Sequence, residues 1–197
     1  MIKLIRYGAV MLMLMPLAGA AQDFNVGLDA YRARDYAAAL QEWRPLAEQG
    51  SDRAQIELGS LYIEGKGVAQ DFAEAVRWYR LAANQGNSTA RMTLARMYDE
   101  GEFVPQDYTE AVRLYRIVAK RGNHSGQSSL GSMYRDGKGV AQNYIKAHMW
   151  FNISAANGNF VGPALRSTVE REMSPDEISE AQLRARVCME SSYQDCD

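Results

Sequence analysis

Apolar residues recur along the chain at helical spacing. Leu58, Gly59 and Tyr62 are spaced so that they share one face of a helix. A second run with the same periodicity extends from Phe72 to Ala83, and Gly86 follows it as the expected helix stop. The pattern therefore predicts two amphipathic helices connected by a loop.

This helix pair is one unit of an internal repeat. Equivalent residues lie 36 positions apart in three successive stretches. They include Gly86, Gly122 and Gly158, then Leu58, Leu94 and Leu130, and also Tyr62, Tyr98 and Tyr134. A fixed period of this length is typical of a solenoid, in which each unit buries its apolar face against its neighbours. We therefore expect an all-α solenoid.

The loop inside each unit carries its own signals. It reads GKGV in the first and third units and GEFV in the second. Asp71, Asp107 and Asn143 come shortly after these loops and are predicted to cap the second helix of each pair. Gly59, in the first helix, is expected to let a neighbouring helix approach closely.

Weaker units flank the three repeats. Residues 21–50 keep the second-helix pattern at the same offset, with a short loop before it. After the third unit we expect a short helix around Phe160 to Arg171, then a capping box from Ser174 to Glu177 and a last helix toward Met189. Because the end units of a solenoid lack a neighbour on one side, these segments are interpreted as caps.

The chain is thus divided into six segments. They are a signal peptide (1–20), an N-terminal cap repeat (21–50), three repeats (51–86, 87–122 and 123–158), and C-terminal capping helices with a tail (159–197).

The first residues follow the order of a secretory signal peptide. Lys3 and Arg6 precede an apolar run from Tyr7 to Leu17, and the small residues Ala18 to Ala21 follow. We expect cleavage after Ala20, with cleavage one residue later as the alternative. An uncleaved anchor is disfavoured because the run is shorter than the roughly 20 residues that span a bilayer. The mature chain is expected to be periplasmic or secreted, without stable membrane insertion.

Charge and cysteine content narrow the possible functions. The formal net charge is -2 and residues of both signs are interspersed, so the chain lacks the basic footprint of a nucleic-acid-binding protein. Cys188 and Cys196 are the only cysteines, and an exported compartment would permit them to form a disulfide.

The sequence shows no catalytic or metal-binding constellation. His124 aligns with Ser88 at an exposed helix start, and His148 aligns with Val76 and Val112, which favours packing over metal binding. No serine or cysteine lies in a nucleophile motif. We expect a protein that is not an enzyme and that uses no cofactor and no metal.

Four motifs of the repeat resemble those of a known family. They read A-x-x-x-L-G-x-x-Y, G-x-G-V, A-x-x-W/L-Y/F-x-x-x-A and a closing G-N. Over residues 54–159, and more loosely over 23–50, the chain resembles the Sel1-like repeat (SLR) family, a branch of the tetratricopeptide repeat (TPR) superfamily. The cap repeat at 21–50 resembles an ordinary TPR more than an SLR. It departs from the motifs at Phe103 in the second loop, and at Ala95 and Gly126 in first helices. The resemblance implies a right-handed superhelix of antiparallel helix pairs.

Positions that recur in every unit are explained by packing of the repeat, whereas positions that differ between units can serve another role. On the first helices they share a face away from the Leu-Tyr stripe, and the resemblance implies that first helices line the concave side, where partners dock. The candidate partner-binding residues are Arg53, Ile56, Ser60, Ile63, Met92, Arg96, Asp99, Ser128, Ser132 and Arg135. The alternative interpretation is ordinary variable surface.

The resemblance implies a scaffold or adaptor that binds an unidentified protein or peptide. A secreted factor that interacts with a host is one alternative. The other is an enzyme that binds or hydrolyses β-lactams, by resemblance to cysteine-rich SLR proteins. Those proteins carry a disulfide in each repeat, whereas no repeat of this chain contains cysteine.

Overall fold

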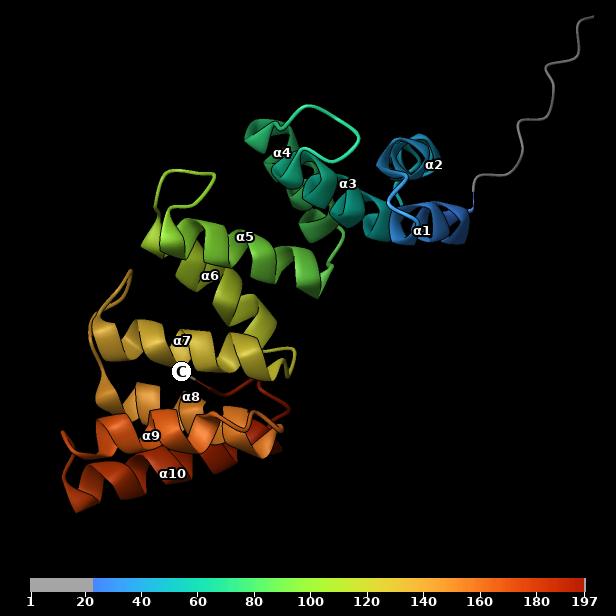
Figure 1. Ribbon diagram of the computed structural model, residues 1–197. Helices are drawn as coiled ribbons and strands as arrows, with labels where there is room; N and C mark the ends of the chain where they lie inside the picture. The colour runs from blue at the N-terminus through green and yellow to red at the C-terminus, as the bar shows by residue number, and fades with distance from the viewer. Residues whose placement is uncertain (1–22, 197) are drawn as a thin grey trace, which may run out of the picture.

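The computed structural model describes residues 23–196, in which every regular element is an α-helix (Figure 1). In chain order these are α1 (Phe24–Arg32), α2 (Tyr36–Glu48), α3 (Asp52–Glu64), α4 (Phe72–Asn84), α5 (Ser88–Glu100), α6 (Tyr108–Ala119), α7 (His124–Asp136), α8 (Tyr144–Ala156), α9 (Gly162–Glu170) and α10 (Pro175–Glu190). The predicted all-α class is confirmed. The predicted signal peptide lies outside the described residues. Within them, none of the helices has the length and apolar character required to cross a membrane.

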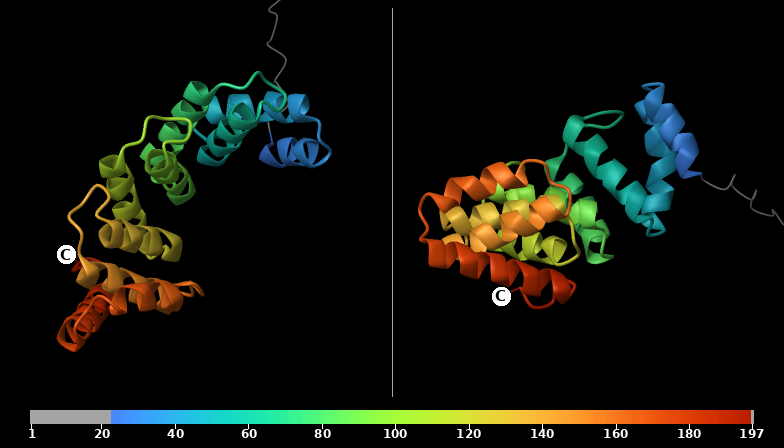
Figure 2. Two further views of the ribbon diagram at one scale, coloured as in Figure 1. Left: turned by 60° about the vertical axis from the view of Figure 1, so that its left-hand side comes forward. Right: turned by 90° about the horizontal axis from the view of Figure 1, so that it is seen from below.

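Consecutive helices pack in pairs, and the pairs stack into a curved solenoid (Figures 1 and 2). The three repeats contribute α3 with α4, α5 with α6, and α7 with α8, while α1 and α2 precede them. At the other end, α9 and α10 both pack against α8. Because each pair contacts mainly the next pair along the chain, the first and last helices lie at opposite ends of the arc.

The second helix of each repeat begins at its predicted cap. The side chains of Asp71, Asp107 and Asn143 accept hydrogen bonds from the backbone amide three residues later, at 3.0, 3.0 and 2.8 Å. These bonds satisfy amides that have no partner within the helix. The first helices each end at a glycine with left-handed backbone, namely Gly65, Gly101 and Gly137.

A glycine in the first helix determines how closely the second helix packs. A Cβ atom on Gly59 would lie 2.7 Å from the ring of Tyr79, and one on Gly131 would lie 2.7 Å from the ring of Phe151. Both rings are buried, so each occupies the space that a side chain would otherwise fill. Gly59 therefore lets α4 approach α3 closely, as the sequence predicts.

Two hydrogen bonds recur at the joints between units. In one, a first-helix side chain donates to a carbonyl at the end of the preceding second helix. The donors are Gln55, Arg91 and Gln127, and the acceptors are the carbonyls of Ala47, Ala83 and Ala119, at 3.0, 2.9 and 3.1 Å. In the other, a second-helix arginine donates to a tyrosine hydroxyl. These pairs are Arg44 with Tyr62, Arg80 with Tyr98, and Arg116 with Tyr134, at 3.1, 2.7 and 3.1 Å.

The C-terminal cap is held by a disulfide. Ser174 and Glu177 form the expected capping box at the start of α10. Cys188, near the end of this helix, is bonded to Cys196 in the tail, and both residues are buried. Between the two cysteines, the hydroxyl of Tyr193 donates a hydrogen bond of 3.0 Å to the side chain of Asn157, which follows α8. The tail is therefore folded back onto the last repeat.

Candidate binding groove

A groove of about 460 Å³ lies between α3 and α5, the first helices of two consecutive units. Ile56, Ser60 and Ile63 line it from α3, and Arg96 lines it from α5. These are four of the ten residues predicted to contact a partner. The other lining residues are Glu64, Tyr79, Thr89, Thr93, Met97, Glu102 and Phe103.

The floor of the groove is apolar and held by packing. Ile56 and Ile63 are half-buried against the core, and Phe103 packs beside them. Tyr79 is buried beneath them, with its hydroxyl 2.9 Å from the Ser60 hydroxyl. Burial raises the pKa of Tyr79, which keeps this hydroxyl protonated and hydrogen-bonded. The floor therefore offers a fixed apolar surface with one polar pair.

Charged side chains of both signs surround this floor. Arg96 has 65% of its side chain exposed, and its Nε lies 4.0 Å from the carboxylate of Glu100. Such an exposed and distant pair is weak, so the guanidinium can bind another carboxylate. Glu64 pairs with Lys66, while Glu102 is exposed on the loop after α5. The rim is thus suited to a ligand that carries charges of both signs.

A carboxyl group beside the groove has an unusual environment. Burial raises the pKa of Glu57, on α3, Arg53 lowers it, and the negative charge of Glu64 raises it again. Its equivalent in the second unit is Thr93, which lines the groove. A basic group from a ligand would favour the ionised form of Glu57.

Three predicted residues take part in contacts outside the groove. The guanidinium of Arg53 lies 4.2 Å above the ring of Phe24 in the N-terminal cap. Asp99 accepts a hydrogen bond of 3.4 Å from the hydroxyl of Tyr115. Met92 is half-buried against the core. Each of these three side chains thus has a contact within the solenoid.

The remaining three lie on α7, beyond the groove. Ser128 accepts a hydrogen bond of 3.1 Å from Asn159. Arg135 forms two hydrogen bonds with the neighbouring Asp136, at 2.6 and 3.0 Å. Ser132 is half-buried on the same helix. The predicted face is therefore not one continuous site. Residues of the first and second repeats line the groove, and those of the third repeat do not.

Sequence reasoning left several lining residues out of the candidate set. Thr93 varies between units, since Glu57 and Ser129 occupy the equivalent positions, and this variation could have identified it. Phe103 was noted only as a departure from the loop motif. Its side chain reaches the groove from the loop, which a comparison restricted to helix faces does not reveal.

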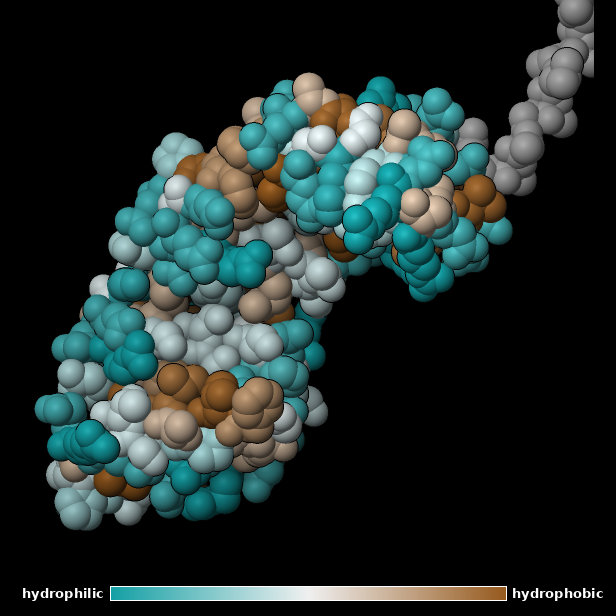
Figure 3. All heavy atoms as spheres, viewed as in Figure 1, coloured by the Kyte–Doolittle hydropathy of each residue, from teal (hydrophilic) through white to brown (hydrophobic). Residues whose placement is uncertain are grey.

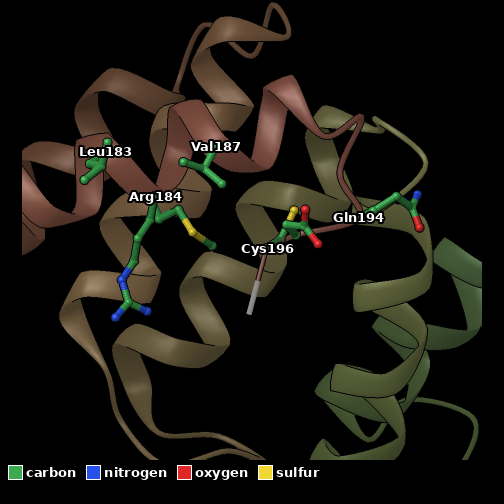
Figure 4. A pocket seen from close by; sticks show the side chains of 7 residues that line it. Leu183, Arg184, Val187, Gln194 and Cys196 are labelled. Atoms are coloured by element: carbon green, nitrogen blue, oxygen red, sulfur yellow. The ribbon is translucent and has the colours of Figure 1, made fainter.

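A second hollow, of about 540 Å³, lies at the C-terminal end (Figure 4). Leu183 and Val187 line it from α10, and their side chains are 53% and 44% exposed. Gln194 and Cys196 line it from the tail. Hydrophobic side chains also gather over the α8 and α9 end of the surface in Figure 3. Among the described residues that line the hollow, the polar side chains of Arg184, Gln194 and Asp195 are half-buried or exposed rather than buried, so we place the candidate site between α3 and α5.

His148 has the packing role that its alignment with valine predicts. Its side chain is fully buried, and Nε2 lies 3.0 Å from the carboxylate of Glu170 on α9. Arg166 lies 3.2 Å from the same carboxylate. Burial lowers the pKa of His148, and the hydrogen bond to Glu170 opposes this effect. Across residues 23–196 there is no cluster of three His, Cys, Asp or Glu side chains that could hold a metal ion.

The stacked helix pairs define a class, the helical-repeat solenoids. A family model described as the Sel1 repeat matches residues 52–87, 89–123 and 124–159. The chain belongs to the Sel1 repeat family.

Solved structures show the same fold. The chain is 34% identical to a Sel1 repeat protein from Oxalobacter formigenes, with a TM-score of 0.60, over 66% of this chain and 97% of that chain. It is 24% identical, with a TM-score of 0.52, to a protective antigen present in uropathogenic Escherichia coli strains that displays an SLR fold. That match covers 86% of this chain and 46% of the antigen chain, so this chain spans about half of the antigen's length. A comparison with curated proteins found no match.

Proposed function

We propose that this protein is an exported binding module that holds a peptide segment of a partner protein in the groove between α3 and α5. The observation that carries the proposal is the convergence of Ile56, Ser60, Ile63 and Arg96 on one groove. These positions vary between units, so packing of the repeat alone does not account for them. Membership of the SLR family adds support, since its members commonly mediate protein interactions.

The groove favours a segment with one apolar side chain and charges of both signs. Ile56 and Ile63 supply the apolar contact, Arg96 would bind a carboxylate, and Glu102 would bind a lysine or arginine. A volume of about 460 Å³ has room for a few side chains rather than a folded domain. A short extended or helical peptide meets these requirements.

Two features support a location outside the cytoplasm. The disulfide between Cys188 and Cys196 is of a kind that persists in oxidising compartments. The charged, apolar and small segments at the start of the sequence have the order of a signal peptide. A periplasmic adaptor and a secreted host-interaction factor share both features. Detection of the protein in culture medium without lysis would identify the secreted form.

We also propose that the groove binds without catalysing a reaction. Its hydroxyl groups support this assignment, since Ser60 is hydrogen-bonded to Tyr79, and the structure places no histidine among the lining residues. The mature protein is expected to leave nitrocefin intact. Turnover that is abolished by a single substitution in the groove would contradict the proposal.

A display experiment tests the groove directly. A random peptide library would be selected against the mature protein and then counter-screened with the variant Thr93→Trp, Arg96→Glu. Thr93 lines the groove and its hydroxyl bonds only the helix backbone, so tryptophan there fills the groove with little damage to the fold. The matched control is Gln182→Trp, Arg186→Glu on exposed positions of α10, which adds the same bulk and charge reversal elsewhere.

The expected outcome is a set of peptides that combine an aliphatic residue with charges of both signs. These peptides should bind the α10 control variant normally and lose at least tenfold in affinity, about 1.4 kcal/mol, against the groove variant. Circular dichroism would verify that all three proteins are folded. Equal affinity for the two variants would show that the groove is not the binding site.

A further inference from the structure

In the second unit, the contact between the start of the first helix and the end of the second helix differs chemically from that in the other two units. In the first unit, Gln85 Nε2 donates a hydrogen bond of 2.8 Å to Gln55 Oε1. In the third, Asn157 Nδ2 donates one of 2.9 Å to the equivalent glutamine. At the same two positions the second unit has Arg91 and Arg121. A neutral pair that satisfies itself is thus replaced by two cations, neither of which can accept a hydrogen bond.

The two guanidinium groups converge beside Gly86. A Cβ atom on this glycine would lie 3.5 Å from Nη1 and 3.6 Å from Nη2 of Arg121, and 4.0 Å from Nη2 of Arg91. Arg91 donates from Nε to the carbonyl of Ala83 at 2.9 Å, and Arg121 donates from Nη1 to the carbonyl of Gly86 at 2.5 Å. These bonds hold both side chains in position and leave the Nη2 groups of Arg91 and Arg121 for a ligand.

Within the part of the chain that the structure describes, this pair has no carboxylate partner. Among residues 23–196, neither Arg91 nor Arg121 forms an ion pair with a carboxylate, and Arg91 Nη1 is buried with no hydrogen-bond partner. A third arginine, Arg113, is nearby, but it is already bound to Glu110 at 2.6 and 2.7 Å. Burial lowers the pKa of Arg91, and the positive charges of Arg121 and Arg113 lower it further. Like charges at this distance repel, and a buried unpaired donor is costly.

The first unit shows that the surface is hollowed at this place. A hollow of about 600 Å³ there is lined by Gln55, Arg77 and Gln85, among others. The equivalent positions in the second unit are those of Arg91, Arg113 and Arg121. In the second unit, Arg121 is exposed and Arg91 is half-buried, and neither lines the groove between α3 and α5.

We propose that Arg91 and Arg121 form a binding site for a phosphate group. Two guanidinium groups, each with donors in a planar fork, match the several acceptor oxygens of a phosphate, and their two positive charges balance its charge of about -1.5 to -2 at pH 7. A single carboxylate would neutralise only one of the arginines. The ligand is an inorganic phosphate or the phosphate of a lipid headgroup.

The other two units supply the test variant. Arg91→Gln with Arg121→Asn recreates the amide pair of the third unit, which this fold already accommodates. Isothermal titration with inorganic phosphate, at constant ionic strength against chloride, is expected to show one site in the native protein and none in this variant. The melting temperature of the native protein should rise by about 2–4 °C when phosphate exceeds its Kd about fivefold.

A second variant, designed to gain a site, distinguishes loss of phosphate binding from misfolding of the first variant. Gln55→Arg with Gln85→Arg places the same two cations in the first unit, beside Arg77, and Glu48→Asn replaces the carboxylate there by the residue at the equivalent position beside the second unit, Asn84. The triple variant is expected to create a second phosphate site. In phosphate-free buffer of low ionic strength, the Arg91→Gln, Arg121→Asn variant should be more stable than the native protein, because the repulsion is removed. A variant that binds phosphate as the native protein does would overturn the proposal, as would equal stabilisation by chloride and phosphate.

A second experiment distinguishes a lipid headgroup from free inorganic phosphate as the ligand. Vesicles of equimolar phosphatidic acid and phosphatidylcholine would be sedimented with the native protein and with the amide-pair variant. Sedimentation that requires both arginines would assign a lipid headgroup. Titration of inorganic phosphate without such sedimentation would assign a free phosphate, and the absence of both would refute the site.

Discussion

The ring centroids of Phe72 and Phe103 lie 4.6 Å apart, which joins the start of α4 to the loop of the following unit. Phe103 occupies the position of a loop glycine and has a left-handed backbone, with φ of 68°. The equivalent glycine of the first unit is Gly67, whose Cβ position would lie 2.6 Å from the carbonyl of Tyr36. The second loop therefore tolerates a side chain that the first cannot.

Replacement of this residue tests that difference. Phe103→Gly relieves backbone strain of about 1 kcal/mol or more and loses an aromatic contact of about 0.5–1.5 kcal/mol, so the stability should change by less than about 1 kcal/mol. The reverse change, Gly67→Phe, should cost more than about 2 kcal/mol because of the clash with Tyr36. Urea unfolding of both variants measures the contrast. Similar losses in the two would contradict it.

The buried pair of His148 and Glu170 predicts a dependence of stability on pH. The pKa of His148 is lowered from its ordinary value of 6.5, so the folded state binds fewer protons than the unfolded state. Its contribution is present above pH 6.5 and is lost as the pH falls below that value. Glu170 and Arg166, both on α9, are the charged groups that contact this site.

Denaturation at pH 7.5 and 5.5 measures this effect. We expect His148→Val, which restores the residue of the other units, to flatten the decline of unfolding free energy over this range. The matched control is His124→Ser, which removes the exposed histidine at the start of α7. An equal decline in the native protein and in His148→Val would show that other groups dominate.

The recurring arginine–tyrosine bonds predict additive losses. Tyr98→Phe removes the hydroxyl that accepts a bond of 2.7 Å from Arg80, and Tyr134→Phe removes the acceptor for Arg116 at 3.1 Å. Each change should cost about 0.5–1.5 kcal/mol. Because the two joints are separate, the double variant should lose the sum of the single losses. Chemical denaturation provides the comparison, and strong non-additivity would show that the joints are coupled.

The disulfide predicts a response to reduction. Cys188 and Cys196 are separated by eight positions, and closure of so short a loop stabilises a fold by about 2–3 kcal/mol in the chain-entropy model. Dithiothreitol should lower the melting temperature of the native protein and have no effect on Cys188→Ala, Cys196→Ala. Increased proteolysis near Tyr193, which the bridge holds against the last repeat, would locate the change. A native protein insensitive to reductant would contradict this role.

Features that depend on the repeat itself were accessible from the sequence. Asp71, Asp107 and Asn143 follow the same local capping rule, once in each unit. Gly59 recurs as Gly131 in the third unit. The positions of the helices follow from such local signals, because each unit folds largely on its own residues and its immediate neighbours.

Relationships between distant positions of the chain were harder to predict. Arg91 and Arg121 are 30 positions apart, and only the antiparallel packing of α5 on α6 brings them together. The sequence does show that both positions hold neutral amides in the other units. It does not show that the two arginine side chains lie next to each other. Arg53 shows the converse, because it varies like a ligand contact yet packs on Phe24 of the N-terminal cap.

The uniform joints have a consequence for the evolution and engineering of this chain. Gly86 and Gly122 occupy equivalent places, so removal of residues 87–122 would connect the first unit to the third through the same turn and the same pattern of bonds. That excision would delete Arg91, Arg121 and one wall of the groove together. A duplication would copy them together. The two proposed sites would then be gained or lost together in a single recombination step.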